Sequence, residues 1–156
     1  ALTVAAKIES AVVRGRLWHA AGRLALRQGE VEQARQAFHE ALSQADIIED
    51  QRFIAIAVEG LATVAALTNE PRQALQLFAT ATVLREDAGS PRLAQHEMEF
   101  AQGMAAVRAT IDAATWDALW ASALRQATEA LHTVIWLRGW TGNTRSFLDL
   151  VLANRS

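Results

Sequence analysis

Apolar residues recur at intervals of three and four along most of the chain, with polar residues between them. This period places apolar side chains on one face of an α-helix. No segment alternates with a period of two for long enough to form a strand. Residues that break helices are sparse, and they fall at Gly29, at 69–71, at 89–91 and at 139–143. The pattern predicts an all-α protein, with helices at roughly 10–28, 31–46, 50–68, 71–87, 91–111, 113–122, 124–138 and 144–153.

Two helix ends carry specific signals. Pro71 falls in the first turn of a predicted helix, where the N–H that proline lacks would have no partner anyway. Gly89 follows a helix end that carries Arg85, which is typical of a left-handed C-terminal cap.

The chain contains an internal repeat with an offset of 40 residues. Residues 30–41 can be aligned with residues 70–81, and six of these twelve positions are identical. The same offset carries Gly29 onto Asn69. We therefore predict one domain over residues 1–156, with repeat 1 at about 10–48, repeat 2 at about 50–88 and C-terminal helices at about 91–153.

The first repeat fits the spacing of a tetratricopeptide repeat. Its large, small and turn positions are Trp18, Ala21, Gly22, Ala25, Gly29, Ala34, Phe38 and Ala41. Gly22 would let the second helix pack closely on the first, while Phe38 would fill the space between layers. Because one pair cannot bury its apolar face alone, neighbouring pairs must stack. The predicted fold is tetratricopeptide-like antiparallel helix pairs in a short right-handed superhelix of about seven or eight helices.

A second ordered series of residues is more specific. It consists of residues 59–66 (Glu-Gly-Leu-Ala-Thr-Val-Ala-Ala), then Pro71, Ala74, Leu77, Ala81, Leu84, Arg85, Gly89 and Pro91. This series resembles the C-terminal tetratricopeptide-like region of large bacterial ATP-binding transcriptional regulators, the LuxR-type, MalT-like proteins. Trp116 and Trp120 match an aromatic pair on a short helix of that family.

The resemblance covers roughly residues 14–136, with departures. Ala79 replaces a glycine usual in the second repeat, a glycine expected near Ala123 is missing, and residues 136–156 have no counterpart. The resemblance implies a region that senses a signal or partner and relays it to a signal-transduction ATPase and a DNA-binding domain. The chain contains neither domain and begins at alanine, so we expect it to be a piece of a longer protein.

Composition narrows the function classes. Alanine makes up about a fifth of the chain, which favours closely packed helices. The net charge of -2 gives no general attraction to nucleic acid or anionic lipid, and the absence of cysteine excludes disulfides, thiolate zinc sites and thiol catalysis. No apolar run approaches the roughly 18 residues of a membrane span, and no signal peptide is visible. We therefore expect a cytoplasmic protein that contacts neither membrane nor nucleic acid directly.

The sequence offers little for catalysis. It contains no phosphate-binding loop, no dinucleotide-binding turn and no H-E-x-x-H motif. His96, Glu97 and Glu99 come nearest to a metal cluster, although a solvated polar face explains them better. The other histidines, His19, His39 and His132, are scattered on different predicted helices. We expect no cofactor and no metal, and we do not expect an enzyme.

The sharpest binding feature is a row of basic residues on the first predicted helix. Tetratricopeptide arrays line their concave groove with the first helix of each pair. The register set by the repeat would point Arg16, His19, Arg23 and Arg27 into the groove, together with Ile56, Glu59 and Thr63 of the second repeat. Guanidinium groups pair bidentately with carboxylates and phosphates. The alternative is the solvated face of an ordinary surface helix.

The remaining tryptophans and the C-terminal tail leave alternatives open. Trp136 and Trp140 would either pack in the core or form an exposed aromatic patch. The apolar residues of 147–152 would need to fold back or be covered in a homodimer. We expect a non-catalytic module that binds a protein partner, a neighbouring domain or a small-molecule effector within a larger bacterial transcriptional regulator. The alternative function is a free-standing tetratricopeptide scaffold that binds an acidic peptide.

Overall fold

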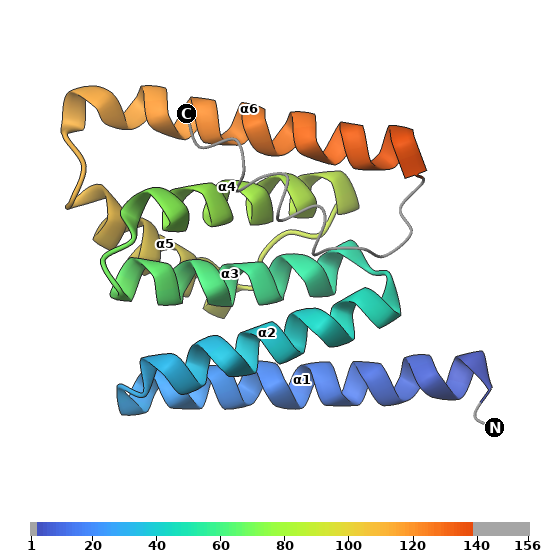
Figure 1. Ribbon diagram of the computed structural model, residues 1–156. Helices are drawn as coiled ribbons and strands as arrows, with labels where there is room; N and C mark the ends of the chain where they lie inside the picture. The colour runs from blue at the N-terminus through green and yellow to red at the C-terminus, as the bar shows by residue number, and fades with distance from the viewer. Residues whose placement is uncertain (1–2, 139–156) are drawn as a thin grey trace.

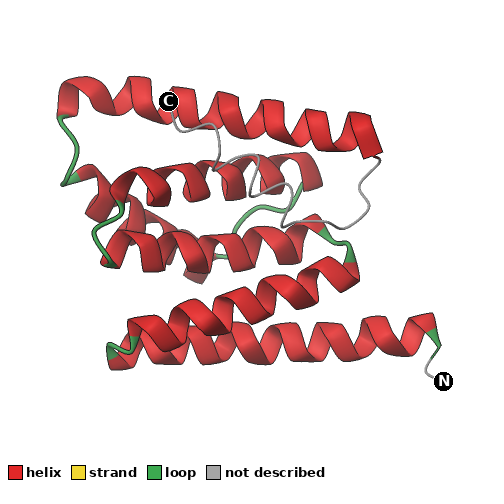
Figure 2. Cartoon of the chain, in the orientation of Figure 1, coloured by secondary structure: helices red, strands yellow, loops and turns green. Residues whose placement is uncertain are grey.

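The computed structural model describes residues 3–138 of the chain, and their side chains as far as residue 132. The described part contains six helices and no strand, which confirms the all-α prediction (Figure 2). The helices are α1 (Val4–Gln28), α2 (Val31–Ile48), α3 (Gln51–Leu67), α4 (Pro71–Ala88), α5 (Ala94–Arg108) and α6 (Ala113–Arg138).

The predicted boundaries fail in three places, one of which is the helix predicted at 91–111, where α5 spans only Ala94–Arg108. Helix α6 is continuous, so the separate helices predicted at 113–122 and 124–138 are wrong. The residues around Ala123 include no proline or glycine that would end a helix. Helix α1 begins at Val4 rather than near residue 10, because the Thr3 side chain accepts a hydrogen bond from the Ala6 N–H and caps the helix. The helix predicted at 144–153 lies outside the described residues.

The predicted helix ends are confirmed. Pro71 is the first residue of α4, and Gly89 ends α4 with a φ of 60°. Gly29 and Asn69, which the repeat aligns, have φ values of 76° and 59°. Both residue types tolerate this left-handed conformation, so the two α-helical hairpins turn in equivalent ways.

The internal repeat is visible in the packing. Helices α1 and α2 form one antiparallel pair, helices α3 and α4 form the next, and α3 packs on α2 (Figure 1). Helices α2 and α4 each have 18 residues, and their aligned residues are buried at equivalent positions: Ala34 and Ala74, Phe38 and Phe78, Ala41 and Ala81. Each pair therefore buries the face that it could not bury alone.

The last two helices depart from this regular stacking. Helix α6 packs along α4, whereas α5 contacts α3 and α4 (Figure 1). Side chains of α5 also contact α1, the first helix of the chain. Only Gly103 and Val107 of α5 are buried. Helix α5 therefore crosses the face formed by α1 and α3, and few of its own residues are buried there.

Glycine and phenylalanine fix the spacing of the layers. A Cβ atom on Gly22 of α1 would lie 2.6 Å from the Phe38 ring, and one on Gly60 of α3 would lie 2.4 Å from the same ring. A Cβ on Gly103 of α5 would lie 2.5 Å from the Phe78 ring. These distances are far below van der Waals contact, so each ring packs on bare backbone. The role predicted for Gly22 and Phe38 is confirmed, while Gly60 and Gly103 extend it to α3 and α5.

The tryptophans divide by position. Trp116 is buried and Trp120 packs against the core, so these two belong to the helix packing. Trp18 is 41% exposed on α1. The Trp136 side chain, Trp140 and residues 147–152 lie outside the described side chains.

None of the helices, within the residues that the structure describes, has a segment long and apolar enough to cross a membrane.

Candidate ligand-binding site

A pocket of about 440 Å³ opens between α1, α3 and α5, and we call it the α1–α3–α5 pocket. The buried rings of Phe38 and Phe78 form part of its floor. Gly60 and Gly103 leave backbone uncovered beside these rings. Its volume lies in the range of small-molecule sites, and most of its lining is apolar with polar groups interspersed, as such sites usually are.

The structure brings together six of the seven residues predicted to line the groove. These are His19, Arg23 and Arg27 from α1 and Ile56, Glu59 and Thr63 from α3, all of which line the α1–α3–α5 pocket. Arg16 instead lines a neighbouring pocket of about 320 Å³ between α1, α2 and α3. His19, Ile56 and His96 line both pockets, so the two cavities are adjacent.

Sequence reasoning missed the contribution of α5. Its pocket residues include His96, Glu99, Phe100 and Gln102. Two of them belong to the trio considered as a metal cluster, but Glu99 forms an ion pair with Arg23 and Glu97 is exposed. Among the described residues, no group of three histidine or acidic side chains could hold a metal ion. The sequence signal for this contribution is the spacing of His96 and Glu99, because residues three apart lie on the same face of a helix.

His19 is the least satisfied polar group of the pocket. Both ring nitrogens are buried, and neither has a hydrogen-bond partner among the described residues. The ring packs near Phe38, with centroids 5.6 Å apart, and lies edge-on to His96 at 6.1 Å. Burial is the main cause that lowers the pKa of His19 from 6.5 to about 4, and the nearby His96 and Arg23 contribute to the same shift. At neutral pH the ring is therefore neutral, with one donor and one acceptor.

We expect His19 to make the fold less stable as the pH falls from 7 to 4. Its pKa is 6.5 when unfolded and about 4 when folded, so the unfolded chain binds more protons between these values. Partial exposure reduces the effect to roughly 1–2 kcal/mol. Besides burial, the charged groups His96, Arg23 and Arg85 lower this pKa, whereas Glu59 raises it. Denaturation with urea at several pH values would measure the change.

The comparison that isolates His19 uses two variants. His19→Phe keeps a ring but removes the titrating nitrogens, so its loss of stability between pH 7 and 4 should be smaller than that of the unchanged protein. His132 is exposed, and His132→Gln should leave the pH profile as it is. Equal pH dependence in the unchanged protein and in His19→Phe would refute this explanation.

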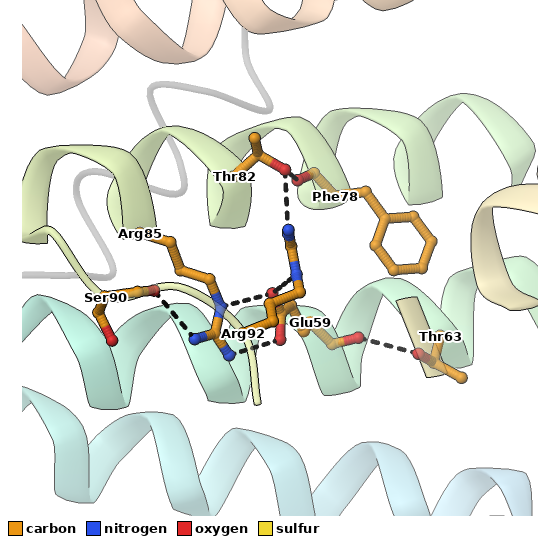
Figure 3. A network of polar contacts seen from close by, with 7 residues as sticks. All are labelled: Glu59, Thr63, Phe78, Thr82, Arg85, Ser90 and Arg92. Atoms are coloured by element: carbon orange, nitrogen blue, oxygen red, sulfur yellow. Dashed lines mark hydrogen bonds and ion pairs between the residues drawn. The ribbon is translucent and has the colours of Figure 1, made fainter. Parts of the chain in front are cut away.

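Glu59 lies at the pocket wall, but its carboxylate is engaged elsewhere (Figure 3). Arg85 donates from Nε to Oε1 at 2.8 Å and from Nη2 to Oε2 at 2.9 Å. Arg92 donates from Nε to Oε1 at 2.6 Å. The side chains of Glu59, Arg85 and Arg92 are only 13%, 5% and 10% exposed. Glu59 therefore joins α3 to α4 and to the segment before α5, and it is not free to bind a ligand.

Further contacts hold the two arginines in place. Arg92 donates from Nη2 to the Thr82 hydroxyl at 3.0 Å, and its guanidinium lies 3.7 Å from the centroid of Phe100 (Figure 3 shows the contact with Thr82). Arg85 donates from Nη1 to the Ser90 carbonyl at 3.4 Å. The network thus fixes the start of α5, which forms one wall of the α1–α3–α5 pocket.

Thr63 is also engaged, since its hydroxyl donates to the Glu59 carbonyl at 3.0 Å (Figure 3). Arg27 differs from the other charged residues of the pocket. It is exposed at the rim, and no hydrogen bond or ion pair joins it to another described residue. Of the predicted residues that line the pocket, Arg27 and His19 are therefore the two whose hydrogen-bonding groups are not used by other described residues.

The charges around the pocket do not balance. Two of its arginines, Arg23 and Arg27, line it directly, and Arg85 and Arg92 stand behind Glu59. Only two carboxylates, those of Glu59 and Glu99, oppose these four guanidiniums. The lining itself is balanced, with two arginines and two glutamates, but the cluster that also includes Arg85 and Arg92 carries an excess of two positive charges, in a chain whose net charge is -2. Such a local excess attracts anions.

Comparisons with known proteins found no match for the chain among protein-family models, curated proteins or solved structures. Function must therefore be argued from the pocket itself.

Proposed function

We propose that the chain is a non-catalytic, effector-sensing module of a larger bacterial transcriptional regulator. Its helix pairs form a short tetratricopeptide-like superhelix, and the face of α1, α3 and α5 is the concave recognition surface. The observation that carries the proposal is the α1–α3–α5 pocket, which collects six predicted groove residues from two repeats around an apolar floor.

The chemistry around the pocket supports binding without turnover. Both pocket carboxylates, Glu59 and Glu99, are held in ion pairs with arginine. The His19 ring forms no hydrogen bond with another described residue. General acid–base catalysis needs a positioned donor and acceptor within hydrogen-bond reach of each other and of the substrate. The described residues around the pocket assemble no such pair.

Helix α5 supplies a means of relaying the signal. It has few buried residues, it forms one pocket wall, and it follows the Glu59 network in the chain. A ligand in the pocket contacts α1, α3 and α5 at once and favours the α5 position that closes on it. A ligand that binds one position better shifts the population towards it.

The second candidate is a scaffold that binds an acidic peptide along α1. Arg16 and Arg27 favour it, because both are exposed and neither has a hydrogen bond or ion pair with another described residue. Helix α5 counts against it, since α5 crosses the face of α1 and α3 where an extended peptide would lie.

An amide NMR titration separates the candidates. We expect 2-naphthoate, an aromatic monocarboxylate, to shift resonances in α1, α3 and α5 while its own spectrum shows no chemical conversion. A hexaglutamate peptide that shifts residues along α1, with no response to 2-naphthoate, would favour the scaffold. The proposal is wrong if neither probe shifts these helices, or if a probe is converted.

A further inference from the structure

We infer that the α1–α3–α5 pocket binds a small organic anion with an apolar body the size of one or two fused rings, its anionic group held at the rim by Arg27. This inference rests on the proposed function and narrows the effector to one chemical class.

The size of the pocket favours a small molecule. Its volume is about 440 Å³, enough to enclose most of a two-ring compound. Its walls come from three helices, because the Arg23–Glu99 ion pair and the His19–His96 contact hold α5 against α1. An extended peptide would have to break these contacts, whereas a compact ligand fits between them.

The floor favours an apolar body. Phe38 and Phe78 are fully buried by their own packing but border the cavity, and Phe100 and Met98 of α5 add apolar surface at its side. Met98 is 58% exposed, so covering it with a ligand removes apolar area from water. Aromatic rings and a methionine thioether adapt well to a flat ring system.

The charge of the surroundings selects an anion. The excess of two positive charges remains after every described ion pair of the pocket is counted. Arg27 is the guanidinium at the rim that no described carboxylate engages. Its planar group can pair with both oxygens of a carboxylate, or with two oxygens of a phosphate or sulfonate.

His19 provides an independent sign of a ligand. Its two ring nitrogens are buried without a hydrogen-bond partner in the part of the chain that the structure describes, which is unfavourable for any polar group. The ring lines the pocket beside Arg23. If the His19 side chain turns so that a nitrogen faces the cavity, a ligand oxygen can accept from the imidazole N–H, or a ligand hydroxyl can donate to the other nitrogen. Binding would therefore satisfy a group that the protein alone leaves unsatisfied.

Calorimetric titration with two probes of the same shape tests the inference. The probes are 2-naphthoate and its uncharged analogue 2-naphthamide. We expect 2-naphthoate to bind about tenfold more tightly, and Arg27→Gln to remove most of that difference while leaving the amide unaffected. Arg72 is exposed at the start of α4, outside the pocket, and Arg72→Gln serves as the matched control.

A second variant tests the role of His19. His19→Phe keeps an aromatic ring, so the far-ultraviolet spectrum of the variant should stay helical. Because it lacks the imidazole nitrogens, its affinity for 2-naphthoate should fall by about threefold to tenfold. If 2-naphthamide binds as tightly as 2-naphthoate, or Arg27→Gln weakens both equally, the inference is overturned. If hexaglutamate shifts α1 while neither naphthalene probe binds, the inference fails and the peptide-binding scaffold is favoured over the effector-sensing module. If none of the three probes binds, both the inference and the proposed function are overturned.

Discussion

Replacing Glu59 by glutamine is expected to lower the free energy of unfolding by about 3–5 kcal/mol. The substitution keeps the size of the side chain and removes its charge. It leaves the guanidiniums of Arg85 and Arg92 almost fully buried without a carboxylate to oppose them. Removing one member of a buried ion pair is costly because the remaining charge stays out of water. Urea denaturation at neutral pH measures the loss.

The control is an acid that pairs on the surface. Glu32 of α2 pairs with Arg35 across one helical turn, but its side chain is 73% exposed. Surface pairs of this kind contribute little, so Glu32→Gln should change stability by less than about 0.5 kcal/mol. Equal effects of Glu59→Gln and Glu32→Gln would mean that the network in Figure 3 does not hold the helices together.

Replacing Gly60 by alanine is expected to destabilise the protein by about 2–3 kcal/mol, although alanine favours helices. The added Cβ would lie 2.4 Å from Phe38, and the ring cannot retreat because Gly22 packs on it as well. The protein must shift its layers or force the ring from its preferred position. Thermal or urea denaturation measures the change.

Two further variants make this prediction specific. Gly15 is also a buried helical glycine, but its added Cβ would meet only Gln44 Cβ at 3.4 Å. Gly15→Ala should therefore be neutral or stabilise the protein by up to about 1 kcal/mol. Phe38→Leu provides room, so the combined Phe38→Leu and Gly60→Ala should be more stable than the sum of the single losses predicts. Strict additivity would contradict the proposed contact.

The sequence predicts the repeated part of the fold well, because local rules and packing agree there. Pro71, Gly29 and Gly89 mark helix ends by backbone geometry alone, and the structure places them at those ends. The 40-residue offset identifies Phe38 and Phe78 as equivalent before any contact is known, and both are buried.

The sequence does not predict where α5 lies. Helix α5 is short, with only two buried residues, so its pattern does not specify which face it covers. Its position depends on contacts between distant segments, such as Arg92 with Glu59 and Glu99 with Arg23. The continuity of α6 was missed for a different reason, since the pattern of apolar residues was divided at a point near Ala123 where no proline or glycine ends the helix.

The candidate site was predicted in outline and misjudged in detail. Helical spacing alone put His19, Arg23 and Arg27 on one face, and the structure places all three at one pocket. Spacing could not show that Glu99 engages Arg23 or that Arg85 and Arg92 engage Glu59. Those pairings decide which groups remain available to a ligand, and they leave Arg27 and His19.

The most direct test of the central claim is to locate 2-naphthoate on the protein by intermolecular nuclear Overhauser effects. The exposed side of α1, with Val13, Leu17 and Trp18, is the competing apolar surface. We predict that the naphthalene protons contact Phe38, Phe78 and Met98 in the α1–α3–α5 pocket. Contacts confined to Val13, Leu17 and Trp18 would contradict recognition by this pocket.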